Sequence, residues 1–221
     1  MRITVFGATG VIGQLAVAEL LSAGHDVVAY VRNPGKVPPT WNGRVTVVVG
    51  EITDAAAVDM AVAGSDAVIS TMGASLRKVV GTPLVDGTRN IVDAMKKHGI
   101  SRYVGNGTPS WRDSRDRLTL SARFGGWLAR TLARSPFART SLVRAYQDMG
   151  GMNTVVAESG LDWTIVRFLA PTNGPKRGNP RVGFPGRDKL GMRISRADIA
   201  AFTVAQLDDD TYVEAAPQIS N

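Results

Sequence analysis

The chain has 221 residues, of which 44% are hydrophobic and 20% charged, and this composition suits one globular domain. It contains no cysteine, which excludes disulfides, thiolate metal sites and a cysteine nucleophile. The formal net charge is +7, but no recognised nucleic-acid-binding motif accompanies it, so we do not expect a nucleic-acid partner. No apolar run approaches the roughly 18 residues of a membrane helix. The first strand begins at once and leaves no room for a signal peptide, so a cytoplasmic location is expected.

Short apolar runs alternate with segments of helical periodicity along the chain. The predicted strands are Ile3–Phe6, Val27–Val31, Val45–Val49, Ala67–Ser70, Arg102–Gly105, Trp163–Arg167 and Tyr212–Ala215. The predicted helices are Val11–Ala23, Ala55–Ala63, Leu84–Lys97, Gly125–Arg134, Leu142–Glu158 and Ala197–Leu207. Repeating strand–helix units of this length predict an α/β Rossmann fold, with a doubly wound, mostly parallel sheet and helices on both faces.

No internal repeat or low-complexity linker divides the sequence, so residues 1–221 are predicted to form a single domain. The stretch Gly174–Gly191 is rich in glycine, proline and basic residues. We expect it to lie above the carboxyl edge of the sheet, within a small substrate-side excursion of residues 171–194.

The strongest local signal is a glycine motif between the first predicted strand and helix, Gly7-Ala8-Thr9-Gly10-Val11-Ile12-Gly13. Gly7 permits a tight turn, Gly10 lets the backbone approach a pyrophosphate, and Gly13 allows the helix to pack closely on the strand. The N–H groups at the helix start then face the anion, aided by the helix dipole. The motif therefore predicts a dinucleotide site, in which Thr9, Val11 and Ile12 also take part.

The end of the second predicted strand indicates which dinucleotide is bound. A site for NAD usually has an Asp or Glu there, which accepts a hydrogen bond from the ribose 2′-hydroxyl. This strand instead runs into Arg32-Asn33-Pro34 and has no carboxylate. A guanidinium at Arg32 can pair with a 2′-phosphate, so NADP(H) is predicted in preference to NAD(H).

The chain resembles the atypical short-chain dehydrogenase/reductases of the NmrA-like, NAD(P)H-binding family, specifically the biliverdin reductase B/flavin reductase type. The resemblance covers nearly the whole length. It is carried, in the expected order, by GATGVIG, AYVRNP, VVGEITD, VISTMG, SGLDWTIVRF and ISRADIA.

This resemblance implies further cofactor contacts at the carboxyl ends of the strands. Glu51 and Ile52 would lie beside the adenine, although the family usually has Asp in place of Glu51. Thr71, Met72 and Gly73 would pass the nicotinamide ribose, and Gly107-Thr108 would lie near the nicotinamide. Phe168, Leu169 and Ala170 replace the family's common Arg-Pro-Pro/Gly sequence, so they would form a different pocket floor.

Many relatives use a Tyr-x-x-x-Lys pair for proton transfer, and here no tyrosine is followed by lysine four positions later. Thr108 is therefore the candidate catalytic hydroxyl, able to orient an acceptor; the alternative is a strand-end turn residue. His25 and His98 are predicted to pair with helix C-terminal carbonyls. No cluster has the spacing of a metal site.

Several carboxylates are predicted to have structural roles. Asp54 should cap the helix near Ala55, Ser195 and Asp198 should form a capping box, and Asp148 should have a structural or supporting role rather than a catalytic one.

A nicotinamide site without a strong acid suits acceptors that take a hydride and draw a proton from water. The sequence thus favours an NADPH-dependent reductase of a flavin-like or quinone-like small-molecule acceptor. The second hypothesis is a non-catalytic NADP(H)-binding redox sensor that meets a protein partner or a membrane surface through residues 118–139. The favoured alternative for this segment is a cover over the active site, with its apolar side packed inward. The third is a sugar-nucleotide epimerase or dehydratase, which the missing Tyr/Lys pair argues against.

Overall fold

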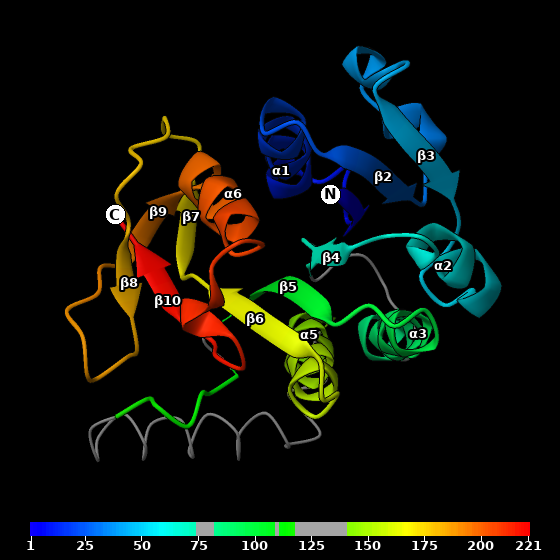
Figure 1. Ribbon diagram of the computed structural model, residues 1–221. Coiled ribbons are helices and arrows are strands. Elements are labelled where there is room, and N and C mark those ends of the chain that lie inside the picture. Colours follow the sequence, from blue (N-terminus) through cyan, green and yellow to red (C-terminus); the bar gives the residue numbers. More distant parts are fainter. Residues whose placement is uncertain (74–81, 109–110, 118–140) are drawn as a thin grey trace.

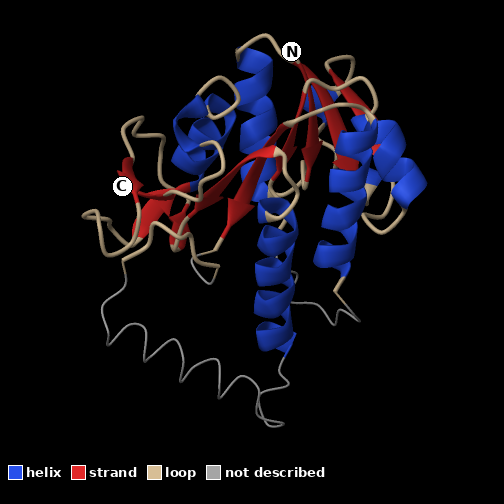
Figure 2. Cartoon of the chain, turned by 60° about the horizontal axis from the view of Figure 1, so that its bottom comes forward, coloured by secondary structure: helices blue, strands red, loops and turns tan. Residues whose placement is uncertain are grey.

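The computed structural model describes residues 1–73, 82–108, 111–117 and 141–221, in which a twisted sheet lies between two layers of helices (Figures 1 and 2). The strands of the main sheet are β1 (Arg2–Phe6), β2 (Asp26–Val31), β3 (Val45–Val49), β4 (Ala67–Ser70), β5 (Arg102–Gly107), β6 (Asp162–Arg167), β8 (Arg181–Gly183) and β10 (Gln218–Ser220). The α-helices are α1 (Val11–Ser22), α2 (Ala55–Val62), α3 (Pro83–Lys97), α5 (Ser141–Ala157) and α6 (Arg196–Ala205). Single turns of 3₁₀-helix span Pro34–Lys36, Pro39–Trp41 and Asp210–Tyr212.

The strand order of the eight-stranded sheet is β3-β2-β1-β4-β5-β6-β10-β8. All neighbouring pairs are parallel except β10 and β8. The chain leaves β1 toward β2 and β3, then returns to place β4 on the other side of β1. This reversal creates a topological switch point, and ligands of such sheets bind outside the carboxyl ends of the strands at that point. The architecture is the Rossmann fold that the sequence predicts.

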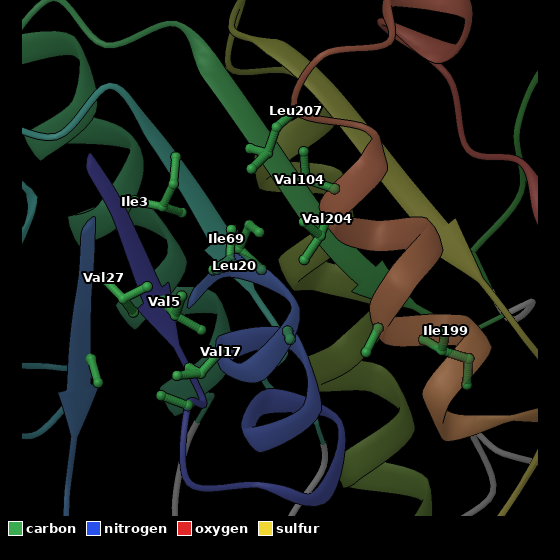
Figure 3. Close-up of a cluster of buried hydrophobic side chains, with 14 of the residues drawn as sticks. Ile3, Val5, Val17, Leu20, Val27, Ile69, Val104, Ile199, Val204 and Leu207 are labelled. Atoms are coloured by element: carbon green, nitrogen blue, oxygen red, sulfur yellow. The ribbon is translucent and has the colours of Figure 1, made fainter. Parts of the chain in front are cut away.

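A hydrophobic cluster fills the space between each face of the sheet and its helices. Figure 3 shows the first cluster, where Val17 and Leu20 of α1 and Ile199 of α6 pack on Ile3 and Ile69 of the sheet. The second cluster joins the opposite face to α2, α3 and α5; its members include Phe6, Val58, Ile91, Met95 and Ile165. Burial on both faces explains why the central strands are continuous apolar runs rather than alternating ones.

The predicted strand Tyr212–Ala215 is wrong. Residues Asp210–Tyr212 form a 3₁₀ turn, which is capped by the Asp209 carboxylate accepting from the Thr211 N–H at 2.9 Å. Glu214 then has a φ of 51°, a left-handed conformation that interrupts an extended run. The final strand β10 forms later, at Gln218–Ser220. The predicted helix Gly125–Arg134 lies outside the described residues.

Side-chain caps begin two helices as predicted. The Asp54 carboxylate accepts from the N–H groups of Ala56 and Ala57, both at 3.1 Å, at the start of α2. The Ser195 hydroxyl accepts from the Asp198 N–H at 2.9 Å at the start of α6. The reciprocal half of the capping box is absent, because the Ser195 N–H donates to Asn221 Oδ1 at 2.8 Å.

Candidate dinucleotide and acceptor site

The turn between β1 and α1 has a conformation that requires glycine. Gly7 has a φ of 76°, and a Cβ added there would lie 2.9 Å from the carbonyl carbon of Thr71. The Gly10 N–H donates to the Gly7 carbonyl at 2.9 Å and closes the turn. A Cβ on Gly13 would overlap that same carbonyl oxygen, so the third glycine lets α1 pack directly on the turn.

The N-terminus of α1 is open to an anion. Gly10 is the N-cap, no side chain among the described residues caps this end, and no acidic residue lies in the first turn. The first N–H groups of a helix have no partner within the helix. Val11 is 63% exposed, so this end of the helix is accessible at the carboxyl edge of β1. An uncapped helix start with no nearby carboxylate in its first turn fits a pyrophosphate.

The end of β4 holds the glycine turn in place. The Thr71 N–H donates to the Phe6 carbonyl at 2.9 Å. The Thr71 hydroxyl lies 3.2 Å from the carbonyl oxygens of both Phe6 and Gly7. Met72 packs partly buried against the second cluster, while Gly73 is exposed. Thr71 therefore supports the phosphate turn from the neighbouring strand.

The end of β2 presents an exposed cation. Arg32 is exposed and forms no ion pair with any residue that the structure describes. Beyond it the Asn33 side chain accepts from the Gly35 N–H at 2.9 Å, which fixes the following 3₁₀ turn. Lys36 in that turn is also exposed. The guanidinium is thus available to a negatively charged ligand beside the glycine turn.

The end of β3 is linked to β2 and α3. The Tyr30 hydroxyl donates to the Glu51 carbonyl at 2.8 Å, while the Glu51 side chain is exposed. Burial, followed by the charges of Asp54 and Glu51, raises the pKa of Tyr30 to about 12. The Ile52 carbonyl accepts from Asn90 at 3.1 Å, and a Cβ on Gly87 of α3 would overlap the Ile52 side chain. Ile52 therefore packs tightly under α3.

The ends of β5 and β6 form the other side of the crevice. Gly107 pairs with Arg167 in register, and a Cβ on Gly107 would lie 2.6 Å from Ile165 Cγ2. Thr108 follows β5; it is half-buried and interacts with other residues of the protein. After β6, Phe168 packs against the first core cluster. The other two predicted contacts follow Phe168: Leu169 is exposed and Ala170 is half-buried.

Sequence reasoning missed a buried ion pair beside this crevice. The Arg167 guanidinium donates to both carboxylate oxygens of Asp116, at 2.7 and 2.8 Å, and to the carbonyls of Ala216 and Trp111. Asp113 nearby accepts from the Ala216 N–H at 2.8 Å. These contacts fasten segment 111–117 to the end of β6 and to Ala216, which precedes β10. The strand motif containing Arg167 was visible in the sequence, but its partner lies 51 residues away.

Asp148 has the structural role that the sequence predicts. Its carboxylate is buried and accepts from the N–H groups of Leu84 at 3.1 Å and Val85 at 3.0 Å. It thereby caps α3 from the neighbouring helix α5.

His98 differs from expectation. His98 Nε2 lies 3.0 Å from Asp59 Oδ1, so this side chain pairs with a carboxylate of α2 and not with a helix carbonyl. His25 lines a cavity of about 430 Å³ between α1, α6 and residues 176–180. None of the predicted cofactor-binding residues lines that cavity.

Residues 7–210 match a protein family described as NAD(P)H-binding. The chain belongs to this NAD(P)H-binding family. The match extends from the glycine turn to beyond α6, and it confirms the family resemblance recognised in the sequence.

Among curated relatives in sequence, phenylcoumaran benzylic ether reductase IRL1 of Ginkgo biloba is 26% identical over 94% of this chain and 65% of its own length. An uncharacterized protein of Mycobacterium tuberculosis is 38% identical over 47% of this chain. The chain spans only 12% of the length of that protein, so the relative is much longer.

Solved structures share the fold of this NAD(P)H-binding chain. A short-chain dehydrogenase/reductase of Veillonella parvula in complex with NADP has a TM-score of 0.75 and 21% identity, covering 100% of this chain and 94% of that one. The anaerobilin reductase ChuY of Escherichia coli O157:H7 also has a TM-score of 0.75 and 21% identity, with coverage of 100% and 97%.

The described residues contain neither a membrane-spanning helix nor a metal-binding cluster. None of their helices combines the length and apolar character that crossing a bilayer requires. No group of three or more His, Asp or Glu side chains in the described ranges could hold a metal ion.

Proposed function

We propose that the protein is an NADPH-dependent oxidoreductase that transfers a hydride to a flavin-like or quinone-like acceptor. The observation that carries the proposal is the uncapped start of α1 at the glycine turn, where backbone N–H groups suit a pyrophosphate. Gly7, Thr9, Gly10, Val11, Ile12 and Gly13 would hold it. Membership of the NAD(P)H-binding family supports the same assignment.

The preference for NADPH rests on Arg32. Its exposed guanidinium has no ion pair within the described residues, and it follows β2, next to β1 in the sheet. A guanidinium binds phosphate through charge-assisted and often bidentate hydrogen bonds. The ribose 2′-phosphate of NADPH would supply such an anion, whereas NADH would leave Arg32 unpaired.

The remaining contacts follow the carboxyl edge from one strand to the next. Glu51 and Ile52 would border the adenosine, and Thr71, Met72 and Gly73 would border the nicotinamide ribose. Gly107 would lie near the nicotinamide. The further contacts proposed at the end of β6 are Phe168, Leu169 and Ala170.

The tyrosines that the structure describes in full are poorly suited to proton donation at neutral pH. Burial raises the pKa of Tyr103 to about 12, and that side chain is 1% exposed in the core. Tyr30 has a pKa of about 12 and is bound to Glu51. Tyr212 lies in the 3₁₀ turn before β10, and burial raises its pKa as well.

The chemistry therefore favours an acceptor that needs no strong acid from the protein. Bound NADPH supplies the hydride, and an oxidised flavin or quinone can take the accompanying proton from water. Thr108, at the end of β5, would orient the acceptor by a hydrogen bond. A ketone would benefit more from a donor at its developing alkoxide.

An absorbance assay tests the proposal. NADPH is mixed with the protein and riboflavin, FMN or a simple quinone, and its oxidation is followed for the natural protein and for Thr108→Ala. We expect sustained oxidation, with a lower kcat in the variant and unchanged NADPH affinity. NADPH binding without turnover on any acceptor would overturn the proposed reductase activity and would support a sensor instead. The segment 118–139, through which a sensor would meet its partner, lies outside the described residues.

A further inference from the structure

The strand at one edge of the main sheet lacks the features that usually prevent an edge from pairing with another chain. β3 pairs with β2 on one side only, and its other side has no strand beside it within the described residues (Figure 1). Its sequence, VTVVV, contains no charged residue and no proline. All of its residues pair with β2 in unbroken register, so no bulge bends it. Edge strands of natural proteins usually carry at least one of these protections.

The opposite edge of the same sheet is protected. β8 is three residues long and begins at the exposed, charged Arg181. Pro180 precedes this strand and Pro185 follows it closely. A proline has no N–H to offer to a neighbouring strand, and a short, charged strand is a poor template for pairing. The two edges of the sheet therefore differ, and only β3 is suited to pair with a further strand.

The backbone groups on the open side of β3 can be identified from its contact with β2. The Gly50 N–H donates to the Val31 carbonyl at 3.0 Å, so Gly50 directs its backbone groups toward β2. The N–H and C=O groups of successive residues in a strand point to alternate sides. Val45, Val47 and Val49 therefore direct theirs away from β2, where no described residue bonds to them. These groups remain available to a second strand.

The side chains of the same residues form an apolar row. Alternate residues of a strand lie on one face of the sheet, so Val45, Val47 and Val49 share a face. Val45 packs partly buried against the first cluster, whereas Val47 is 37% exposed and Val49 is 51% exposed. A row of exposed valines beside unpaired backbone groups is suited to strand addition, which supplies both hydrogen bonds and apolar contacts.

This edge is complementary to itself. In an antiparallel ladder, two residues that face each other across the strands exchange both of their hydrogen bonds. A two-fold axis beside Val47 would pair it with Val47 of a second copy, and would pair Val45 with Val49. That register uses every outward N–H and C=O group of the strand and gives about six hydrogen bonds. A shift of two residues would leave one outward residue of each strand unmatched.

The charges that flank β3 favour the antiparallel direction. Arg44 precedes the strand and Glu51 follows it closely; both are exposed and neither forms an ion pair with a described residue. Antiparallel pairing brings the basic start of each strand beside the acidic end of the other. Parallel pairing would instead bring Arg44 close to Arg44. A two-fold contact also uses both β3 edges at once, so assembly stops at two chains.

We propose that two copies of the chain form a two-fold dimer through antiparallel pairing of their β3 strands, with the Val47 residues opposite each other. The two main sheets then continue into one another. Their carboxyl edges point in opposite directions, so each copy keeps its own crevice at the glycine turn. The dimer does not depend on which reaction the protein catalyses.

Analytical ultracentrifugation over a range of protein concentrations tests the dimer. We expect the mass of the natural protein to rise from one chain to two. Val47→Lys should raise the dissociation constant about tenfold or more, because two like charges would lie directly opposite each other. Met192→Lys is the matched control, since Met192 is 69% exposed. It precedes β9 (Arg193–Ser195), which pairs with β7 (Ala170–Thr172) at the other end of the molecule (Figure 1).

Engineered cysteines test the register, and the chain has no cysteine of its own to interfere. Opposite residues of a hydrogen-bonded pair have Cα atoms about 5.5 Å apart, within the range of about 4.4–6.8 Å that a disulfide spans. Val47→Cys should therefore form a disulfide-linked dimer on mild oxidation. In Val49→Cys the two cysteines would lie four residues apart along the strands, about 14 Å, so it should not cross-link. A mixture of Val45→Cys and Val49→Cys should cross-link.

Each experiment has an outcome that overturns the proposal. A mass of one chain at every concentration would exclude the dimer, and a natural-like dimer of folded Val47→Lys would place the interface elsewhere. Val49 is more exposed than Val47, so random collisions would cross-link Val49→Cys at least as efficiently as Val47→Cys. That result would overturn the register. None of these outcomes bears on NADPH oxidation, so the dimer and the reductase stand or fall separately.

Discussion

Arg167 and Asp116 form a two-point ion pair whose side chains are 0% and 4% exposed. Arg167 ends β6, and Asp116 belongs to the segment that follows β5, so the pair joins the two strand ends that border the proposed acceptor site. Two charges removed from water are tolerated only when they satisfy each other. The pair is therefore expected to hold segment 111–117 in place.

Removing one partner of this pair should destabilise the protein strongly. Asp116→Ala leaves the Arg167 charge buried without its carboxylate, which typically costs about 3–5 kcal/mol of unfolding free energy. Urea unfolding followed by circular dichroism measures the change. As a control, Asp86→Ala breaks the exposed pair with Arg89, at 3.2 Å, and should cost less than about 1 kcal/mol. Similar losses of unfolding free energy in both variants would show that burial does not set the contribution of the Arg167–Asp116 pair to stability.

Asp198 links the start of α6 to the segment before β8. Burial acts to raise the pKa of its carboxyl, but hydrogen bonds from Gly178, Ser195, Asn221 and Arg177 outweigh burial and lower it. A carboxyl whose folded-state pKa is depressed stabilises the fold above its unfolded pKa, about 3.9, and this contribution disappears as the pH falls through the folded pKa.

Asp198→Asn should therefore lower the unfolding free energy at pH 7 by about 1–3 kcal/mol. The difference from the natural protein should shrink as the pH falls below about 4. Denaturant titrations at several pH values measure both effects. Asp26→Asn, at an exposed carboxylate that begins β2, is the control and should change little. A deficit of constant size down to the lowest pH would contradict an ionised, stabilising Asp198.

Arg32→Ala tests the choice of dinucleotide. Loss of a guanidinium–phosphate contact should weaken NADPH binding by about 10- to 100-fold while NADH binding changes little. Fluorescence titration of each dinucleotide gives both affinities, and Arg44→Ala controls for the loss of one exposed charge. The 2′-phosphate assignment fails if the two dinucleotides lose affinity equally.

Gly13→Ala tests the close packing of α1 on the glycine turn. The added methyl group would overlap the Gly7 carbonyl oxygen, so the turn must shift, which we expect to cost about 1–3 kcal/mol and to weaken NADPH binding. Gly150→Ala in α5 is matched to it, because no atom lies within 4 Å of the added Cβ. That control should be neutral or slightly stabilising. Thermal unfolding and NADPH titration of both variants measure stability and affinity. Unchanged stability and NADPH affinity in Gly13→Ala would contradict the packing argument.

The sequence predicted features that depend on local pattern or on simple topology. The β1–α1 turn was recognisable because its three glycines lie between an apolar run and a helical period. The parallel sheet followed from the repeated units, and with it the expectation that Arg32, Thr71 and Gly107 would end strands at one edge.

Features that depend on contacts between distant residues were not predictable. The Arg167–Asp116 pair spans 51 positions, and nothing near Asp116 in the sequence indicates its partner. The strand expected at Tyr212–Ala215 is interrupted by the left-handed Glu214, whose N–H donates to the Trp163 carbonyl at 2.7 Å. His98 pairs with Asp59 because α2 and α3 pack side by side, which helical periodicity alone does not reveal.

Calorimetric titration of the purified protein with NADPH and NADH tests the central claim most directly. The account predicts saturable binding to one site per chain, with NADPH bound more tightly than NADH. A folded protein that gives no heat and no measurable affinity with either dinucleotide would contradict it.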